Sequence, residues 1–150
     1  EGMISGQCLD LYQTHPGEHY DKKSHEKTLR LIHELKTGQL MMACVNMAIS
    51  ASDNPDVQAT QALRNYAYLL GLAFQIQDDY LDCYASPDIL GKGHASDKHN
   101  EKITFADCYS QQELNDLTIH YYQSALQELN YFGYRSEKLQ RLTRDLQQRQ

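Results

Sequence analysis

The spacing of apolar residues most constrains the fold of this chain, because apolar side chains recur every three to four positions along most of its 150 residues. Few segments alternate apolar and polar residues with a period of two, and proline and glycine are scarce, at three and eight residues. Strands therefore have little support, whereas helices have it throughout. The sequence predicts an all-α fold, and its length predicts a single domain with a modest core.

Capping residues and helix breakers predict where the helices begin and end. Ser24 is the expected cap of a helix that runs to Ile49 and is interrupted at Gly38, by either a kink or the close approach of another segment. The segment 53–56, with the sequence DNPD, predicts an Asx cap with proline at the first helical position. The helix that starts there is the longest and is expected to end near Tyr84.

The second half of the chain predicts a long loop and two more helices. Residues 86–104 lack apolar periodicity, and a loop of this length in a compact domain tends to be functional or mobile. The sequence SQQE at 110–113 is a capping box that starts the next helix, and Gly133 is well placed to end it. A last, basic helix follows Ser136.

Charge and hydropathy exclude several classes of protein. A net charge of −6 argues against binding to nucleic acid. A mean hydropathy of −0.67 and a longest apolar stretch of only residues 41–51 predict that no segment spans a membrane. The four cysteines lie about thirty residues apart, so neither a zinc site nor a disulfide framework is indicated, and a cytoplasmic protein is expected. The chain opens on apolar residues with no cap before them, so we expect it to start part-way along a helix.

Carboxylates near the end of the longest predicted helix are the main candidates for chemistry. At 100° per residue, Gly71, Gln75, Asp78 and Asp82 form one stripe, with Asp79 beside it. Repulsion between these acids, together with the helix dipole, costs about 1 kcal/mol, so a cation is expected to compensate. Oxygen ligands at this density suit Mg²⁺, which also bridges to substrate phosphates. The alternative is an acidic helix end in water.

Three lysines could supply the positive charge that a bound diphosphate needs. Each lies next to, or close to, a hydroxyl or a glycine: Lys36 before Thr37, Lys92 after Gly91, and Lys102 two residues before Thr104. A single lysine is most often a surface residue, which is the alternative for each of them.

Four segments, in this order and separation, resemble a known family. They are GMISGQCLDL (2–11), HELKTGQL (33–40), GLAFQIQDDYLD (71–82) and LGKGHASDKHNEKITF (90–105). Together they resemble the C-terminal half of trans-isoprenyl diphosphate synthases, most of all the bacterial farnesyl and geranylgeranyl diphosphate synthases. The resemblance implies that residues 1–150 are the C-terminal part of a single polyprenyl synthase domain with the isoprenoid-synthase helical fold. In that fold two aspartate-rich motifs face each other across a cavity and bind three Mg²⁺ ions with the allylic diphosphate.

The resemblance also implies roles for individual residues. The implied metal-binding residues are Asp78 as a direct ligand, and Asp79, Asp82 and Asp10 through bound waters, with Gln7 in support. The implied diphosphate-binding residues are Lys36, Lys92 and Lys102. Lys36 also belongs to the implied catalytic set with Thr37 and Gln75, whose oxygens lie near the allylic carbon and ease its positive charge.

The implied reaction joins isopentenyl diphosphate to dimethylallyl or geranyl diphosphate and gives farnesyl or a longer diphosphate. It needs no side-chain nucleophile, and the sequence offers no Ser-His-Asp or Cys-His set. Five histidines are expected to be surface or loop residues: His19, His25, His33, His94 and His99. The full-length protein is expected to be a homodimer.

The chain also departs from the family pattern. The first aspartate-rich motif would precede residue 1, so this chain alone is expected to be inactive. In the 90–105 segment, residues 95–97 read ASD where G-x-D is common, and Ile103 stands where serine is frequent. An alternative function is a non-catalytic partner subunit of a heteromeric prenyl synthase, although the intact acids at 78, 79 and 82 argue against it.

Overall fold

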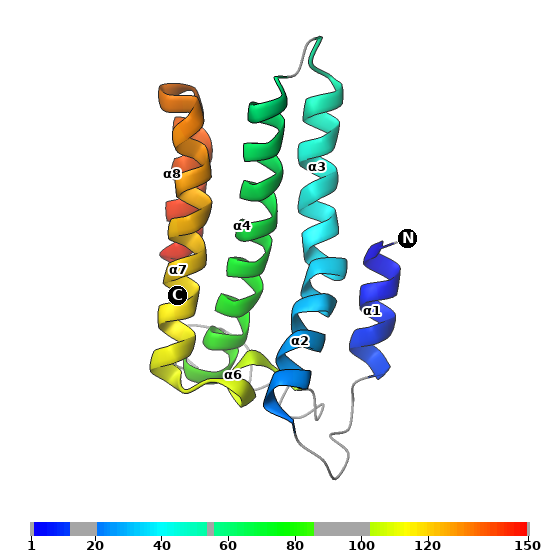
Figure 1. Cartoon of the computed structure of the whole chain (residues 1–150). Helices are drawn as coiled ribbons and strands as arrows, with labels where there is room; N and C mark the ends of the chain where they lie inside the picture. Colours follow the sequence, from blue (N-terminus) through cyan, green and yellow to red (C-terminus); the bar gives the residue numbers. More distant parts are fainter. Residues whose placement is uncertain (1, 13–20, 54–55, 86–102, 150) are drawn as a thin grey trace.

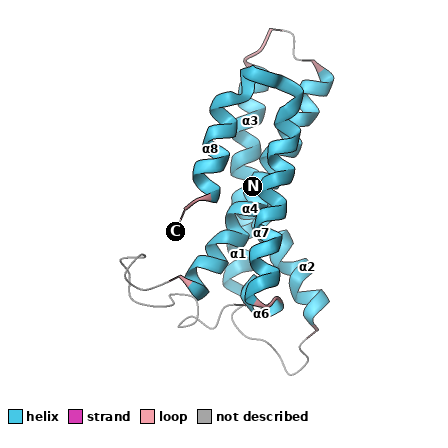
Figure 2. Ribbon diagram, turned by 90° about the vertical axis from the view of Figure 1, so that its left-hand side faces the viewer, coloured by secondary structure: helices cyan, strands magenta, loops and turns pink. Residues whose placement is uncertain are grey.

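A computed structural model of the chain describes residues 2–12, 21–53, 56–85 and 103–149. Every regular element in this part of the chain is helical (Figures 1 and 2), so the predicted all-α fold is confirmed. The elements are α1 (Gly2–Tyr12), α2 (Lys22–His33), η1 (Glu34–Gly38), α3 (Gln39–Ser50), α4 (Val57–Tyr84), α6 (Phe105–Cys108), α7 (Gln111–Leu129), η3 (Asn130–Ser136) and α8 (Glu137–Gln147). None of the described helices combines the length and apolar character that a membrane span requires.

Helix α4 is the centre of the bundle. It packs against α7 on one side and against η1 and α3 on the other, and α1 lies against η1 (Figure 1). The chain rises through α2, η1 and α3 in that view, descends through α4 and rises again through α7. The side view in Figure 2 shows the short helix α6 at the lower end of the bundle, where it packs against α2, α4 and α7.

The starts of two helices differ from the predicted ones. The cap of α2 is Asp21, whose carboxylate accepts from the Lys23 amide at 3.3 Å, rather than Ser24. The cap of α4 is Asp56, which accepts from the amides of Gln58 and Ala59 at 3.2 and 3.3 Å, so the predicted cap within 53–54 is wrong. In both cases several capping residues stand close together, and a carboxylate that reaches free amides is the one used.

The capping box and the helix-ending glycine predicted in the second half of the chain are present. Ser110 and Glu113 form the predicted capping box, in which Glu113 accepts from the Ser110 amide at 2.8 Å. Gly133 has a positive φ of 54°, which glycine adopts without strain, and it separates α7 from α8. Helix α6 was not predicted, and its signal is a second capping box between Thr104 and Asp107. Most of the predicted loop, residues 86–102, lies outside the described residues.

Glycines let three helices approach closely around η1. The helix that contains Gly38 widens to a π-helical turn there, and a Cβ built on Gly71 of α4 would lie 3.3 Å from the Gly38 Cα. A Cβ built on Gly6 of α1 would lie 2.5 Å from the Lys36 amide nitrogen, where no side chain fits. Of the two alternatives expected at Gly38, the close approach of another segment is therefore present, and the helix is interrupted there by a π-helical turn.

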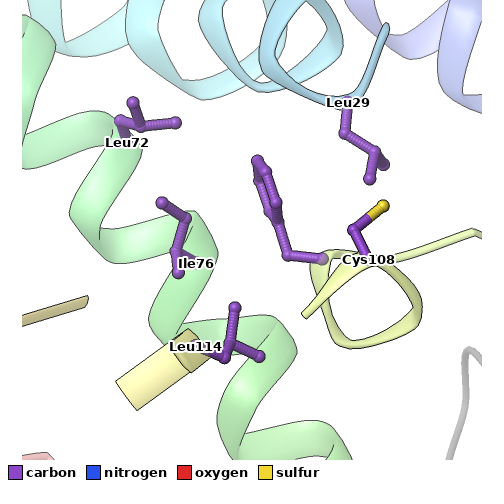
Figure 3. Close-up of a cluster of buried hydrophobic side chains, with 6 residues drawn as sticks. Leu29, Leu72, Ile76, Cys108 and Leu114 are labelled. Atoms are coloured by element: carbon purple, nitrogen blue, oxygen red, sulfur yellow. The ribbon is translucent and has the colours of Figure 1, made fainter. Parts of the chain in front are cut away.

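Two clusters of buried side chains form the core. One joins α2, α4, α6 and α7 (Figure 3), and its members are Leu29, Leu72, Ile76, Phe105, Cys108 and Leu114. The other joins α4 and α7, and its members are Tyr66, Leu70, Ala73, Tyr122, Ala125 and Leu129. Because Phe105 is fully buried, the first cluster anchors α6 beside α4 by the hydrophobic effect.

Candidate active site

A cavity of about 280 Å³ opens where α1, α2, η1 and the C-terminal half of α4 meet the residues that lead into α6. Its lining residues are Asp10, Leu29, Ile32, His33, Lys36, Thr37, Gln75, Asp78, Asp79, Asp82, Ile103 and Thr104. Four of them are acidic, and three are aliphatic. Aliphatic walls exclude water and strengthen the electrostatic interactions of the charged groups beside them.

The cavity brings together most of the residues predicted for the site. These are Asp10, Lys36, Thr37, Gln75, Asp78, Asp79 and Asp82. Gln7 is exposed on α1 and does not line the cavity. Lys92 and Lys102 lie outside the described residues. Asp79 lines the cavity although it is offset from the stripe, because the cavity is wider than one row of a helix.

Two of the cavity carboxylates form ion pairs with cations of the same chain. Lys36 Nζ lies 2.8 Å from Asp10 Oδ2, which joins η1 to α1. Arg149 Nη2 lies 2.5 Å from Asp78 Oδ1, and its guanidinium lies 4.3 Å from the ring centroid of Phe74. The cation that the acidic helix end was expected to need is thus supplied in part by the chain itself.

Arg149 was missed in the sequence analysis, where it was only one of several basic residues near the end of the chain. Its position depends on contacts across the bundle, since Gln77 Nε2 donates to the carbonyl oxygens of Gln147 at 3.1 Å and Arg149 at 3.4 Å. Tyr122 Oη in turn donates to Gln77 Oε1 at 2.6 Å. These contacts hold the residues after α8 against α4.

Asp78 and Asp79, neighbouring acids on α4, lie in different environments. Burial raises the pKa of the Asp78 carboxyl above its ordinary value, although the nearby Arg149 charge lowers it. Asp79 Oδ2 accepts a hydrogen bond of 2.8 Å from the Phe105 amide. Asp79 therefore fixes the start of α6 at the edge of the cavity.

The prediction that His33 is a surface or loop residue is wrong. Its side chain is 11% exposed and lines the cavity at the end of α2. Nδ1 lies 3.0 Å from Gln75 Oε1, and the ring stacks on Phe105 with 5.3 Å between centroids. Burial lowers the pKa of His33 to about 4, so the ring is neutral at pH 7. The available signal was its spacing of three and four residues from Lys36 and Thr37, which places all three near one face.

The donor set fits Mg²⁺ in its chemistry. Within the described residues, no three acidic, histidine or cysteine side chains are close enough to hold a metal ion by themselves. Mg²⁺ does not require such a cage, because it takes one or two carboxylates and completes its shell with water and phosphate oxygens. Asp10 and Asp78 both line the cavity and already form ion pairs with Lys36 and Arg149, so their carboxylates are suitable ligands for such an ion.

Comparison with known proteins identifies the family. The model of the polyprenyl synthetase family matches residues 1–131. The chain belongs to the polyprenyl synthetase family. It is 37% identical over 134 residues to the farnesyl diphosphate synthase of Haemophilus influenzae, and the alignment covers 86% of this chain and 42% of that protein. It is 34% identical over 110 residues to the farnesyl diphosphate synthase of Bacillus subtilis, covering 73% of this chain and 35% of that protein.

The fold comparison agrees with the sequence comparison. A crystal structure of a geranyltransferase from Legionella pneumophila superposes with a TM-score of 0.77 at 38% identity, over 99% of this chain and 44% of that one. The predicted isoprenoid-synthase fold is therefore confirmed. The chain spans less than half the length of these relatives.

Proposed function

We propose that this chain is the C-terminal part of a polyprenyl synthase domain, and that the full-length protein condenses isopentenyl diphosphate with dimethylallyl or geranyl diphosphate. The product is farnesyl or a longer diphosphate. The observation that carries the proposal is the convergence of four carboxylates and Lys36, drawn from α1, η1 and α4, on one cavity in a chain related to farnesyl diphosphate synthases. The full-length protein is proposed to be a cytoplasmic homodimer.

Lys36, Thr37 and Gln75 are the proposed catalytic residues. Lys36 binds the allylic diphosphate as a point charge, and Lys92 and Lys102 contribute further positive charge. When the bond between the allylic carbon and the diphosphate oxygen breaks, negative charge grows on the leaving group. Lys36 stabilises that charge more strongly in the transition state than in the ground state, which accelerates the step.

The oxygens of Thr37 and Gln75 act on the other side of the breaking bond. They face the allylic carbon and stabilise its positive charge as dipoles fixed in advance. The double bond of isopentenyl diphosphate then attacks this carbon, a carbon–carbon bond forms, and the released diphosphate takes up the proton that is lost. The aliphatic side chains Leu29 and Ile32 help to keep water away from the cation.

The four acids of the cavity form the proposed metal-binding set. Asp78 is the proposed direct ligand, and Asp79, Asp82 and Asp10 hold metal-bound waters, with Gln7 in support. Mg²⁺ at these residues would supply positive charge that neutralises the departing diphosphate. Residues 1–150 alone are proposed to be inactive, because the first aspartate-rich motif is not among them.

Product analysis of the full-length protein tests the proposal. Purified protein with Mg²⁺, labelled isopentenyl diphosphate and either allylic diphosphate should give elongated products, and residues 1–150 alone should give none. Lys36→Ala should abolish most of the elongation, whereas Lys138→Ala, at an exposed position on α8, should leave it unchanged. Absence of elongation by the Mg²⁺-supplied full-length protein would contradict the proposal and favour a non-catalytic partner subunit.

A further inference from the structure

His33 is a largely buried imidazole, 11% exposed, in the cavity, and the proposed mechanism gives it no role. It is the last residue of α2, directly before the π-helical turn that contains Lys36 and Thr37. Both ring nitrogens lie near residues of α4: Nδ1 is 3.0 Å from Gln75 Oε1, and Nε2 is 4.0 Å from Asp79 Oδ2. The Nε2 atom is buried and has no hydrogen-bond partner among the described residues.

The hydrogen bonds around Gln75 define the orientation of its amide. Gln75 Nε2 lies 3.5 Å from Asp78 Oδ2, and Oε1 lies 3.0 Å from His33 Nδ1. A carboxylate only accepts, so the amide NH₂ belongs on the Asp78 side and the amide oxygen on the His33 side. The reverse orientation would set two acceptors, the amide oxygen and the carboxylate, against each other.

This orientation determines which nitrogen of His33 carries the proton. The Gln75 oxygen only accepts, so His33 Nδ1 must donate to it. In a neutral ring Nε2 is then unprotonated, which agrees with the finding that no acceptor of the described residues lies within hydrogen-bond distance of it, Asp79 Oδ2 being 4.0 Å away. The ring has little freedom to turn, because it stacks on Phe105, whose amide is held by Asp79.

We propose that His33 is a positioning residue, which donates from Nδ1 to Gln75 Oε1 and so keeps the amide oxygen, rather than the amide NH₂, available to the developing allylic cation. The inference rests on the proposed function. Without the imidazole donor the Gln75 amide can flip and present its positively polarised NH₂ group where positive charge develops. The loss should affect the ionisation step more than substrate binding, because the diphosphate is held elsewhere, by Lys36.

Matched variants of the full-length protein test this role. His33→Phe keeps the ring and its stacking but removes the donor, and should lower kcat about tenfold or more with KM for the allylic diphosphate changed less than threefold. His33→Asn places an amide N–H close to the position of Nδ1 and should restore kcat to within about threefold of wild type. His25→Phe, on the same helix but outside the cavity, should leave kcat unchanged.

The protonated nitrogen can be observed directly, independently of activity. Long-range ¹H–¹⁵N spectra of the full-length protein with labelled histidine should show His33 at pH 7 with a protonated Nδ1 and an unprotonated Nε2. A ring protonated on Nε2 overturns the inference, as does a kcat of His33→Phe equal to that of His25→Phe, or a failure of folded His33→Asn to restore kcat. Failure of the wild-type protein to elongate any substrate would instead contradict the proposed function, and the spectra would still test the His33–Gln75 geometry.

Discussion

Replacing Arg149 with alanine should weaken the fold and tighten Mg²⁺ binding at the same time. Arg149 forms an ion pair with Asp78, the proposed direct metal ligand, at 2.5 Å. A cation of the protein and a metal ion cannot both occupy the same carboxylate oxygen. If Asp78 binds Mg²⁺ as proposed, the free energy of the ion pair opposes metal binding, and its removal favours the metal.

The magnitude follows from the exposure of the two side chains. Arg149 and Asp78 are 32% and 38% exposed, so solvent screens the pair and its contribution is about 1 kcal/mol at most. The contact with the Phe74 ring adds about 0.5–1 kcal/mol. The Nε of Arg149 is buried without a hydrogen-bond partner among the described residues, and this desolvation cost offsets part of the stabilisation. Arg149→Ala should therefore lower the free energy of unfolding by about 1–2 kcal/mol and lower the Kd for Mg²⁺ about fivefold.

Two measurements on the full-length protein check this prediction. Urea unfolding without metal reports the loss of stability, and titration calorimetry of Mg²⁺ with an unreactive allylic diphosphate analogue reports the affinity. The control is Arg141→Ala, which removes another Arg–Asp pair, with Asp145, whose side chains are 84% and 65% exposed. That variant should change neither quantity measurably. If Arg149→Ala leaves Mg²⁺ affinity unchanged or weakens it, Arg149 does not compete with the metal for Asp78.

Two further predictions concern residues around the same cavity. Asp78→Ala should lower kcat more than Asp79→Ala or Lys92→Ala, and a near-normal kcat for Asp78→Ala would contradict its role as a metal ligand. Of the three variants, Asp79→Ala should lower the thermal midpoint most, because it leaves the Phe105 amide without its acceptor. The pKa of His33 in the folded protein is about 4, below its ordinary value of 6.5, so the unfolded chain binds more protons between these two pH values. The contribution of His33 to the free energy of unfolding is therefore fully present above about pH 6.5 and falls by up to about 3 kcal/mol toward pH 4. Unfolding free energies measured from pH 7 to pH 4 should show this decline in wild type but not in His33→Phe.

The parts of the site that were predicted from the sequence are those that one helix defines locally. Gln75, Asp78 and Asp82 are three, four or seven residues apart, so helix geometry alone places them on one face. The neighbouring residues Lys36 and Thr37 come to the same cavity because glycines at 38 and 71 let η1 and α4 approach closely. The sequence indicated a close approach at Gly38, where a glycine interrupts a helical pattern, but it did not indicate that the approaching residue is Gly71 of α4.

The parts that were missed depend on contacts between distant segments. Gln75 and His33 are 42 residues apart in sequence, and Asp78 and Arg149 are 71 apart. The apolar pattern of a single helix cannot predict such contacts, because the two residues come together only after the helices have packed. Helix α6 was missed for a different reason, since four residues are too few for an apolar period, and its capping box was the only local sign.

The balance of charge around the cavity explains how an acidic helix end can be stable before any ligand binds. Repulsion and the helix dipole both disfavour the carboxylates of α4, yet Arg149 lies against Asp78, and the Phe105 amide donates to Asp79. Lys36 similarly lies against Asp10. Of these partners, the Phe105 amide belongs to a fully buried residue, whereas the side chains of Lys36 and Arg149 are 37% and 32% exposed at the ends of long stems. If the full-length protein binds a diphosphate and metal ions here as proposed, these ligands would exchange partners with Lys36 and Arg149, while the hydrogen bond between Asp79 and the Phe105 amide keeps α6 in place at the edge of the cavity.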